Sequence, residues 1–534
     1  MIRDFRSFDG EAEIACDLCI GGAGAAGIAL GLAFGGHSKR VVVLESGGFE
    51  FEQEVQDLYR GRSVGQTYWD LDATRVRQFG GSTNHWGGMS APLDERDFLP
   101  RSWIPYSGWP IRRADLEPFY PAAHEILDLG PGGYDPTVLE PAGGLLPLAP
   151  EQLVPRVFRF SSPPTWLGQK YRPELEAARG VEIWLHANVV DIELGADGRA
   201  GAFVVSDLAG KRAKVRARIF VLALGGIENA RLLLNCDRQI AAGIGNQHDL
   251  VGRFFMDHLG VSAGRVLLVR EDWEAAYQSG HHPQAGGHEV QHALAPSDAL
   301  QRSAEILNNA AAFGKVTYER PRSEGYGALH DIKEGVRERR LPDDFGANLW
   351  RVVSDLDGVA RGLWERFDPT TYLTMESEQA PNPDSRVRLD REQDALGLRR
   401  VVLDWRLSEI DHRTVRVAAA TIAAELGRLG VARVQLGEWL LREEVTWPDD
   451  LTASNHHLGT TRMADDPRRG VVDRDGRVFG CDNLYVAGSS VFPTGGFANP
   501  TVNLVALTLR LAEHLRTRLS DPLPAASGSL AERR

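Results

Sequence analysis

The sequence has few cysteines, no long basic run and no basic-then-apolar leader. Its 534 residues include four cysteines, which are too few for a disulfide framework at this length. Asp and Glu number 73 against 60 Lys and Arg, so the formal net charge is −13, which disfavours nonspecific attraction to nucleic acid or to an anionic membrane. Without a leader we expect a cytoplasmic protein, although export on a partner's signal stays open.

One uncharged stretch imitates a membrane span. Residues 18–36, LCIGGAGAAGIALGLAFGG, are about long enough to cross a bilayer, but their seven glycines weaken that interpretation. Cys16 and Cys19 have the spacing of a redox or metal pair, yet no second pair completes a zinc site. We therefore predict no membrane insertion and no metal site, and we interpret both cysteines as buried strand residues.

The order of apolar runs and glycine turns predicts an α/β protein. Hydrophobic residues make up 43% of the chain and charged residues 25%, as in ordinary globular proteins. Residues 13–45 predict a strand, a helix and a second buried strand, which together form a βαβ unit. Further predicted elements are strands at 181–194, 200–207 and 214–224, a helical region around 330–367, an antiparallel group at 371–379, 386–390 and 399–407, and a capped amphipathic helix at 408–430.

A glycine motif lies in the turn of the βαβ unit. Residues 22–27, GAGAAG, fit the pattern G-x-G-x-x-G, whose glycines allow a tight turn and close approach of a pyrophosphate to a helix N-terminus. Glu45 lies 18 residues after Gly27, at the end of the next predicted strand, where its carboxylate can accept the hydroxyls of a ribose. We predict a dinucleotide site. The long irregular passage after Glu45 favours FAD over NAD.

The C-terminal region combines two histidines with a predicted helix start. His456 and His457 precede a Gly-Thr turn, and Asn499 and Pro500 stand where the N-cap and first residue of an amphipathic helix are expected. The positive end of such a helix stabilises negative charge, such as that of a reduced flavin. The plainer alternatives are that Asn499 only caps the helix and that the histidines form a polar pair in a loop.

These motifs together resemble the glucose–methanol–choline (GMC) family of flavoprotein oxidoreductases. The similarity covers the chain in the family's order, from GAGAAG and VLES through FGGSTNHWGG, LALGGIENARLLL and GIGNQHDLVGRFFMDH to HHLGTTRM and NLYVAGSSVFPTGGFANPTVN. The NHW triplet and the Asn in FANPT are similar to the sugar-oxidising branch, which includes pyranose oxidase, fructose dehydrogenase and bacterial glycoside 3-oxidase.

The resemblance implies roles for individual residues. His456 corresponds to the base that takes the substrate hydroxyl proton, and Asn499 to its partner on the same oxygen. His457 stays open as an alternative base. The implied FAD-binding residues are Gly22, Ala23, Gly24, Ala26, Gly27, Glu45, Gly81, Ser82, Asn84, His85, Trp86, Gly87, Val189, Gly488, Ser489, Asn499, Pro500 and Thr501.

Two of these positions depart from the family's pattern or leave alternatives. Gly488 and Ser489 replace the family's usual acid, which leaves the contacts to the pyrophosphate or ribityl chain there open. His85 corresponds to a residue that in some pyranose oxidases bonds covalently to the flavin. Here Asn84 precedes it instead of Thr, so a covalent bond, a non-covalent contact and an incidental position all stay open.

The resemblance implies a Rossmann-like FAD-binding domain interleaved with a substrate domain built on an antiparallel sheet with helices. We assign 1–98, 180–262 and 455–518 to the first, 99–179 and 263–454 to the second, and 519–534 to a disordered tail. The expected reaction is oxidation of a secondary alcohol, at C2 or C3 of a sugar or glycoside. Alternatives are a dehydrogenase of a non-sugar alcohol, an FAD-containing lyase, an NAD-dependent dehydrogenase and a catalytically idle binding protein. The electron acceptor and the oligomeric state stay open.

Overall fold

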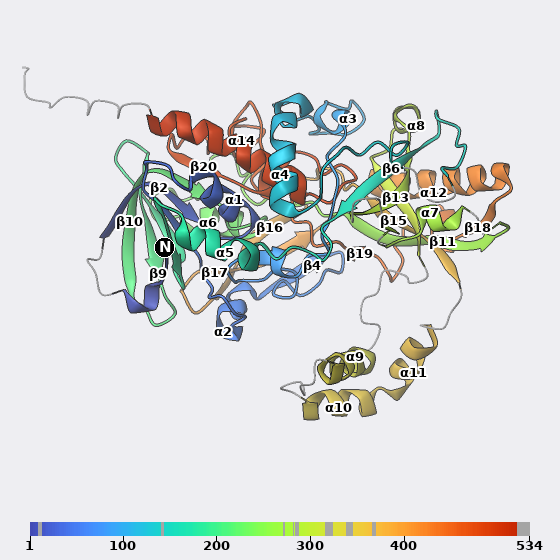
Figure 1. The fold of residues 1–534 in the computed structure, drawn as a ribbon, viewed down its shortest axis with the longest axis horizontal. Helices are drawn as coiled ribbons and strands as arrows, with labels where there is room; N and C mark the ends of the chain where they lie inside the picture. Colours follow the sequence, from blue (N-terminus) through green and yellow to red (C-terminus); the bar gives the residue numbers. More distant parts are fainter. Residues whose placement is uncertain are drawn as a thin grey trace, which may run out of the picture.

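The computed structural model contains three sheets, which lie along its longest axis (Figure 1). It describes residues 1–8, 13–139, 144–270, 273–280, 282–283, 288–314, 324–337, 345–365 and 370–520. The largest hydrophobic core forms around the eight-stranded sheet and a second core around the nine-stranded sheet. Within the described ranges, no helix is long and apolar enough to cross a membrane.

The first sheet has eight strands in a mostly parallel arrangement. Its order is β1 (Ile2–Asp4), β7 (Val181–Leu185), β3 (Val41–Leu44), β2 (Glu13–Gly21), β10 (Arg212–Leu222), β9 (Ala200–Ser206) and β8 (Asn188–Leu194), with β20 (Leu484–Val486) also paired to β10. Only the β8–β9–β10 edge is antiparallel. All four residues of β3 are buried, as an interior parallel strand requires.

The predicted βαβ unit is confirmed. Strand β2 leads through the glycine turn into α1 (Ala25–Phe34) and then to β3, which pairs parallel to β2. Cys19 is fully buried in β2 and Cys16 is half-buried, and both are free thiols. Helix α1 packs against α14 (Thr501–Ser520) and α5 (Leu167–Ala177).

Two strand predictions are corrected. Residues 181–194 form two strands, β7 and β8, because the chain turns at His186, which has a φ of 55°. The group at 371–407 is also split between two sheets. Strand β15 (Thr371–Ser377) lies in the nine-stranded sheet, while β16 (Arg386–Gln393) and β17 (Arg399–Trp405) form a small sheet with β4 (Gly61–Gly65), which runs parallel to β17. Sequence pattern shows that a strand forms but not which neighbour it finds.

The second large sheet is antiparallel throughout. Its order is β18 (Ala432–Leu436), β11 (Leu259–Leu268), β15, β14 (Asn309–Gly314), β13 (Glu289–Pro296), β6 (Leu153–Phe160) and β5 (Met89–Ser90), with β12 (His282–Pro283) beside β13 and β19 (Thr452–Ala453) beside β11. Helix α12 (Glu409–Leu429) packs across this sheet, and its N-terminus carries the predicted capping box, formed by Ser408 and Asp411.

Three helices between β14 and β15 stand apart from the rest of the chain (Figure 1). They are α9 (Glu324–Arg337), α10 (Phe345–Ser354) and α11 (Leu356–Glu365), in the region where helices are predicted. The remaining helices are α2 (Gln53–Gln56), α3 (Glu95–Phe98), α4 (Tyr120–Leu127), α6 (Glu228–Asn235), α7 (Glu274–Tyr277), α8 (Asp298–Ser303) and α13 (Glu438–Leu441). Of the predicted tail, residues 519 and 520 belong to α14, and 521–534 lie outside the described residues.

Candidate active site

A cavity of about 390 Å³ opens at the carboxyl ends of the parallel strands. Loops that follow β2, β3 and β10 line it, which is where α/β sheets bind their ligands. The predicted site residues that line it are Gly22, Gly24, Ala26, Glu45, Gly81, Ser82, His85, Trp86, Gly87, Val189, His456, Gly488, Ser489, Asn499, Pro500 and Thr501. Ala23, Gly27 and Asn84 are not among its lining residues.

The three glycines of the motif have different reasons to lack a side chain. A Cβ on Gly22 would overlap the carbonyl oxygen of Ala223, and a Cβ on Gly27 would overlap that of Gly22, so the fold itself requires both glycines. A Cβ on Gly24 would meet only Gly81 Cα, at 3.8 Å. Because nothing in the protein occupies that space, Gly24 keeps open a part of the cavity next to the N-terminus of α1.

Glu45 ties the end of β3 to the glycine turn. Its Oε2 accepts from the backbone N–H of Ala23 at 2.8 Å, and its Oε1 accepts from that of Gly47 at 2.9 Å. Burial raises the pKa of Glu45, and these hydrogen bonds oppose the rise. Ala23 thus belongs to the site through its backbone, which orients the carboxylate on the cavity wall.

The glycine-rich loop 79–88 holds its own shape. Gly80 has a φ of 103°, which favours glycine, and Thr83 Oγ1 donates to its carbonyl at 2.6 Å. Asn84 Nδ2 donates to Phe79 O at 2.8 Å, and Trp86 Nε1 donates to Thr165 O at 2.9 Å. The structure therefore gives Asn84 a role within the loop rather than on the cavity wall, while His85 lines the cavity.

His456 and Asn499 meet in the lining of this cavity. Asn499 Nδ2 lies 3.3 Å from His456 Nε2, and Asn499 Oδ1 is buried without a hydrogen-bond partner among the described residues. The helix start is corrected by one residue. Helix α14 begins at Thr501, and Pro500 O accepts its first bond, from Leu504 N at 2.8 Å. The Asn499 side chain points to His456 and does not cap the helix.

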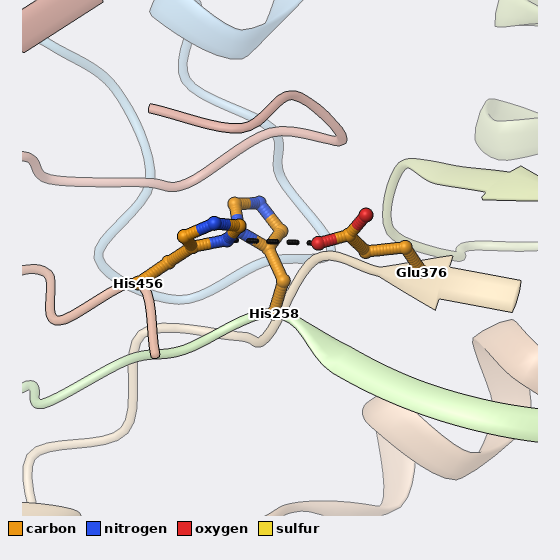
Figure 2. Close-up of side chains that lie close together, drawn as sticks. All are labelled: His258, Glu376 and His456. Atoms are coloured by element: carbon orange, nitrogen blue, oxygen red, sulfur yellow. Dashed lines mark hydrogen bonds and ion pairs between the residues drawn. The ribbon is translucent and has the colours of Figure 1, made fainter. Parts of the chain in front are cut away.

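Two further side chains lie beside the Nδ1 atom of His456 (Figure 2). His258 Nδ1 is 2.9 Å from His456 Nδ1, and Glu376 Oε1 is 3.6 Å from the same atom. Asp257 Oδ1 accepts from the backbone N–H of both His258 and His456, each at 2.8 Å. Among the described residues, His258, Glu376 and His456 are the group whose atoms lie close enough to share a metal ion.

Burial dominates the electrostatics of this cluster. It lowers the pKa of His456 well below its ordinary value, with further lowering by His258 and His457, and it also lowers that of His258. It raises the pKa of Glu376 to about 7. His456 is therefore neutral near pH 7, the state in which an imidazole accepts a proton.

His457 has different surroundings. Burial lowers its pKa to about 3, and its ring is tilted against those of Tyr68 and Phe255, with centroids 6.3 and 5.9 Å away. Ser489 Oγ donates to its carbonyl oxygen at 2.7 Å. The ring also lines the cavity, but it is His456 whose Nε2 faces Asn499.

A second cavity of about 230 Å³ lies over one face of the antiparallel sheet. Met89 lines both cavities, and Glu376, which lines the second, lies 3.6 Å from His456, which lines the first. The two cavities therefore lie close together, with Met89 in the lining of both. The second is lined by polar Ser279, Gln291, Thr374 and Glu376 and by Phe158, Ala293, Ala310, Ala311 and Ala312.

Comparisons with known proteins identify one family segment and several relatives. A family model described as "GMC oxidoreductase" matches residues 381–508. The fructose dehydrogenase large subunit of Gluconobacter japonicus is 26% identical over 84% of this chain and 81% of its own length. The 6'''-hydroxyparomomycin C oxidase of Streptomyces lividus is 24% identical over 96% of this chain and 93% of its own.

The chain carries a GMC oxidoreductase C-terminal domain. A C-glycoside 3-oxidase of Microbacterium trichothecenolyticum is 28% identical over 61% of this chain and 52% of its own length. In fold, the chain is similar to pyridoxine 4-oxidase from Mesorbium loti, with a TM-score of 0.51 and 16% identity over 94% of this chain and 99% of that one. The chain is also similar in fold to a formate oxidase, with a TM-score of 0.53 and 15% identity over 94% of this chain and 98% of that one.

The chain is an oxidoreductase that acts on CH–OH groups and uses FAD. Two features of the cavity fit that cofactor. The space beside Gly24 adjoins free N–H groups at the start of α1, as a pyrophosphate requires, and Glu45 presents a carboxylate suited to ribose hydroxyls. The FAD-binding roles of the individual residues remain predictions.

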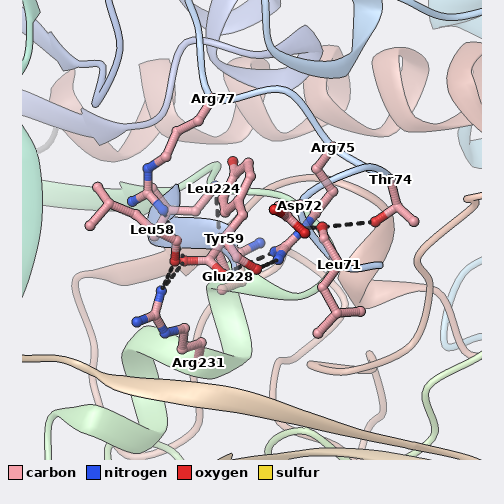
Figure 3. A network of polar contacts seen from close by, with 12 residues as sticks. Leu58, Tyr59, Leu71, Asp72, Thr74, Arg75, Arg77, Leu224, Glu228 and Arg231 are labelled. Carbon is pink, nitrogen blue, oxygen red and sulfur yellow. Dashed lines mark hydrogen bonds and ion pairs between the residues drawn. The ribbon is translucent and has the colours of Figure 1, made fainter. Parts of the chain in front are cut away.

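A polar network in the same cavity was not predicted (Figure 3). Glu228 accepts from Arg75 Nη1 at 2.9 Å, Arg77 Nη1 at 3.4 Å and Arg231 Nη1 at 3.1 Å, and these three cations hold its pKa at about 2 despite burial. The guanidinium groups of Arg75 and Arg77 lie 4.0 and 4.7 Å from the centre of the Tyr59 ring. Arg75 and Arg77 lie just before the glycine-rich loop in the sequence, but no sequence pattern shows that they meet Glu228.

Proposed function

We propose that this enzyme oxidises a secondary ring hydroxyl, at C2 or C3 of a sugar or glycoside. The observation that carries the proposal is the position of His456 and Asn499, which face each other at 3.3 Å in the lining of the first cavity. A hydroxyl between them would donate its proton to His456 Nε2 and accept a hydrogen bond from Asn499 Nδ2. FAD, when bound, supplies the acceptor for the hydride that the carbinol carbon loses.

The second cavity suits a sugar ring. Strands β14 and β15 pair so that Ala310 lies opposite Glu376 and Ala312 lies opposite Thr374. These four residues therefore share one face of the sheet. The small alanines leave room for a flat ring, and the polar groups around them can bond its hydroxyls. Relatives named fructose dehydrogenase and C-glycoside 3-oxidase support this substrate class, and the latter name favours C3.

The proposed domain division follows the two cavities. The segments 1–98, 180–262 and 455–518 supply most of the lining of the first cavity, and 263–454 supply most of that of the second. We therefore keep these segments, together with 99–179, as the FAD-binding and substrate domains.

The test is anaerobic stopped-flow flavin reduction with a panel of sugars, methyl glycosides and non-sugar alcohols. His456→Ala should retain FAD but slow its reduction by about 10²- to 10⁴-fold, since a general base contributes that much. His457→Ala is the matched control and should change the rate less than tenfold. If only His457→Ala slows flavin reduction, the base is His457 instead of His456. A wild-type rate of flavin reduction in both variants would refute the proton transfer proposed here.

The same experiment gives the pH dependence. Burial and the two neighbouring histidines, His258 and His457, lower the pKa of His456, whereas Glu376 and Asp257 are the acidic groups beside it. As the pH is lowered, the wild-type rate should therefore stay constant past the ordinary histidine pKa of about 6.5. It should fall only at a lower pH, where His456 becomes protonated. A rate that begins to fall at pH 8 as the pH is lowered would contradict this lowered pKa.

Three alternatives have direct readouts. Reduction by aliphatic alcohols but by no sugar would indicate a dehydrogenase of a non-sugar alcohol, and cleavage without any flavin reduction would indicate a lyase. The electron acceptor follows from reoxidation with oxygen or with a dye. Flavin that stays with the denatured chain in wild type but not in His85→Ala would show a covalent bond at His85.

A further inference from the structure

A chain of hydrogen bonds behind the catalytic pair fixes which nitrogen carries each proton. His258 Nε2 lies 2.8 Å from the carbonyl oxygen of Gly496, which can only accept, so that nitrogen carries a hydrogen. Burial lowers the pKa of His258, so its ring is neutral and its Nδ1 is a bare acceptor. His456 Nδ1, 2.9 Å away, must then be the donor.

This arrangement leaves the lone pair of neutral His456 on Nε2, the atom that faces Asn499. The opposite tautomer would present an N–H to the substrate hydroxyl and could not take its proton. It would also set two bare Nδ1 atoms against each other at 2.9 Å. The hydrogen-bond partner of one ring nitrogen commonly decides the protonation of the other in histidine sites.

We propose that His258 is a positioning residue that holds His456 in the Nδ1–H tautomer, so that its Nε2 is always free to act as the base. The proposal rests on the proposed function in so far as His456 is that base. It assigns a role to a residue 198 positions away in the chain.

The backbone supports the same pairing. Asp257 Oδ1 accepts from the N–H groups of His258 and His456, and its Oδ2 accepts from Tyr68 Oη at 2.5 Å. One carboxylate thus fixes both histidine main chains, which sets the spacing of the two rings. Glu376, at 3.6 Å from His456 Nδ1, places a carboxyl beside the ring that becomes positively charged when Nε2 takes a proton.

The tautomer can be observed without turnover. In FAD-loaded enzyme labelled with ¹⁵N in its histidine rings, NMR should show His456 protonated at Nδ1 and bare at Nε2, with the signal assigned by its loss in His456→Asn. His258→Leu removes the acceptor and should shift His456 toward the Nε2–H form. His258→Asn places an oxygen near the former Nδ1 and should keep the wild-type tautomer, and His457→Ala should leave it unchanged.

Two NMR results would overturn the proposal. One is a wild-type His456 that carries its hydrogen on Nε2, which is also what a metal ion bridging the two Nδ1 atoms and Glu376 would require. The other is a His258→Leu enzyme whose His456 tautomer does not change. Because neither result depends on a substrate, a failure of the proposed sugar oxidation leaves this test intact.

Kinetics separate a positioning role from a merely structural one. With methyl β-D-glucopyranoside and 1,5-anhydro-D-glucitol as probes, His258→Leu should keep FAD and substrate affinity but slow flavin reduction by about 10- to 100-fold, as loss of a residue that orients a ligand commonly does. His258→Asn should recover most of that rate. Equal slowing by both variants, or a loss that lies only in substrate affinity, would refute the tautomer role. If neither these probes nor any other sugar or glycoside of the panel reduces wild-type flavin, the proposed function is what fails, and the NMR result still decides the role of His258.

Discussion

Gly24 offers a test of the cofactor cavity that separates binding from folding. A Cβ at this position would meet only Gly81 Cα at 3.8 Å, and the backbone angles, φ −79° and ψ −162°, suit any L-residue. Without FAD, the free energy of unfolding of Gly24→Ala should therefore lie within about 1 kcal/mol of that of the wild type. Alanine stabilises the protein by restricting the unfolded chain, but it is a poorer N-cap residue than glycine, and the two effects oppose each other. The added methyl group instead occupies the space that the cavity keeps open beside the N-terminus of α1.

The magnitude for binding follows from the same geometry. A methyl group in the path of the pyrophosphate should weaken FAD binding at least tenfold, or about 1.4 kcal/mol, and Gly24→Val should abolish it. The assay is flavin absorbance after desalting, with urea unfolding of the apo-proteins measured in parallel because bound FAD would itself add stability. Gly27→Ala is the matched control, since its Cβ would overlap Gly22 O and should destabilise even the apo-protein. If folded Gly24→Val retained one FAD per chain, the glycine motif would not be part of the FAD-binding site.

Two other substitutions probe the network and the second cavity. Glu228→Gln leaves Arg75, Arg77 and Arg231 without their shared carboxylate and should lower the free energy of unfolding by about 3–5 kcal/mol at pH 7, measured by urea titration. The pKa of Glu228 is about 2 in the folded protein, so the difference in free energy of unfolding between wild type and Glu228→Gln should be complete above about pH 4.5 and vanish as the pH falls through 2. A difference that does not depend on pH would contradict an ionic origin. Ala312→Leu fills the second cavity and should leave FAD content unchanged while raising KM for the sugar at least tenfold; an unchanged KM would place the substrate elsewhere.

The sequence predicted best what is local. The βαβ unit, the glycine turn and Glu45 lie within one stretch of 33 residues whose apolar periodicity and turn chemistry decide the structure. The capping box of α12 was predicted for the same reason. The start of α14 was displaced by one residue, because the Asn499 side chain bonds His456 across space, and no local preference for capping reveals such a partner.

The parts that were missed depend on contacts between distant segments. Strand β15 has the pattern of its sequence neighbours β16 and β17, yet it pairs with β11 and β14, which come earlier in the chain. The sequence does not predict a role for His258, because that role depends on a hydrogen bond to a residue 198 positions later. The hydrogen bond by which the Asn84 amide closes the loop on Phe79 O also has no signal in the sequence pattern, and an FAD-binding role for Asn84 stays a prediction.

The division between the two sheets has a consequence for specificity. His456 and Asn499 stand on loops of the C-terminal segment, whereas the lining of the second cavity comes mainly from the face of β13, β14 and β15. Side chains on that face can change without moving Asp257, which holds the base by its main chain. Glu376 is the exception, since it lines the second cavity and also lies 3.6 Å from the His456 ring. Substitutions at Ala310 or Thr374 should therefore alter which hydroxyl compound is accepted, while a change at Glu376 should alter both the substrate and the acidity of the base.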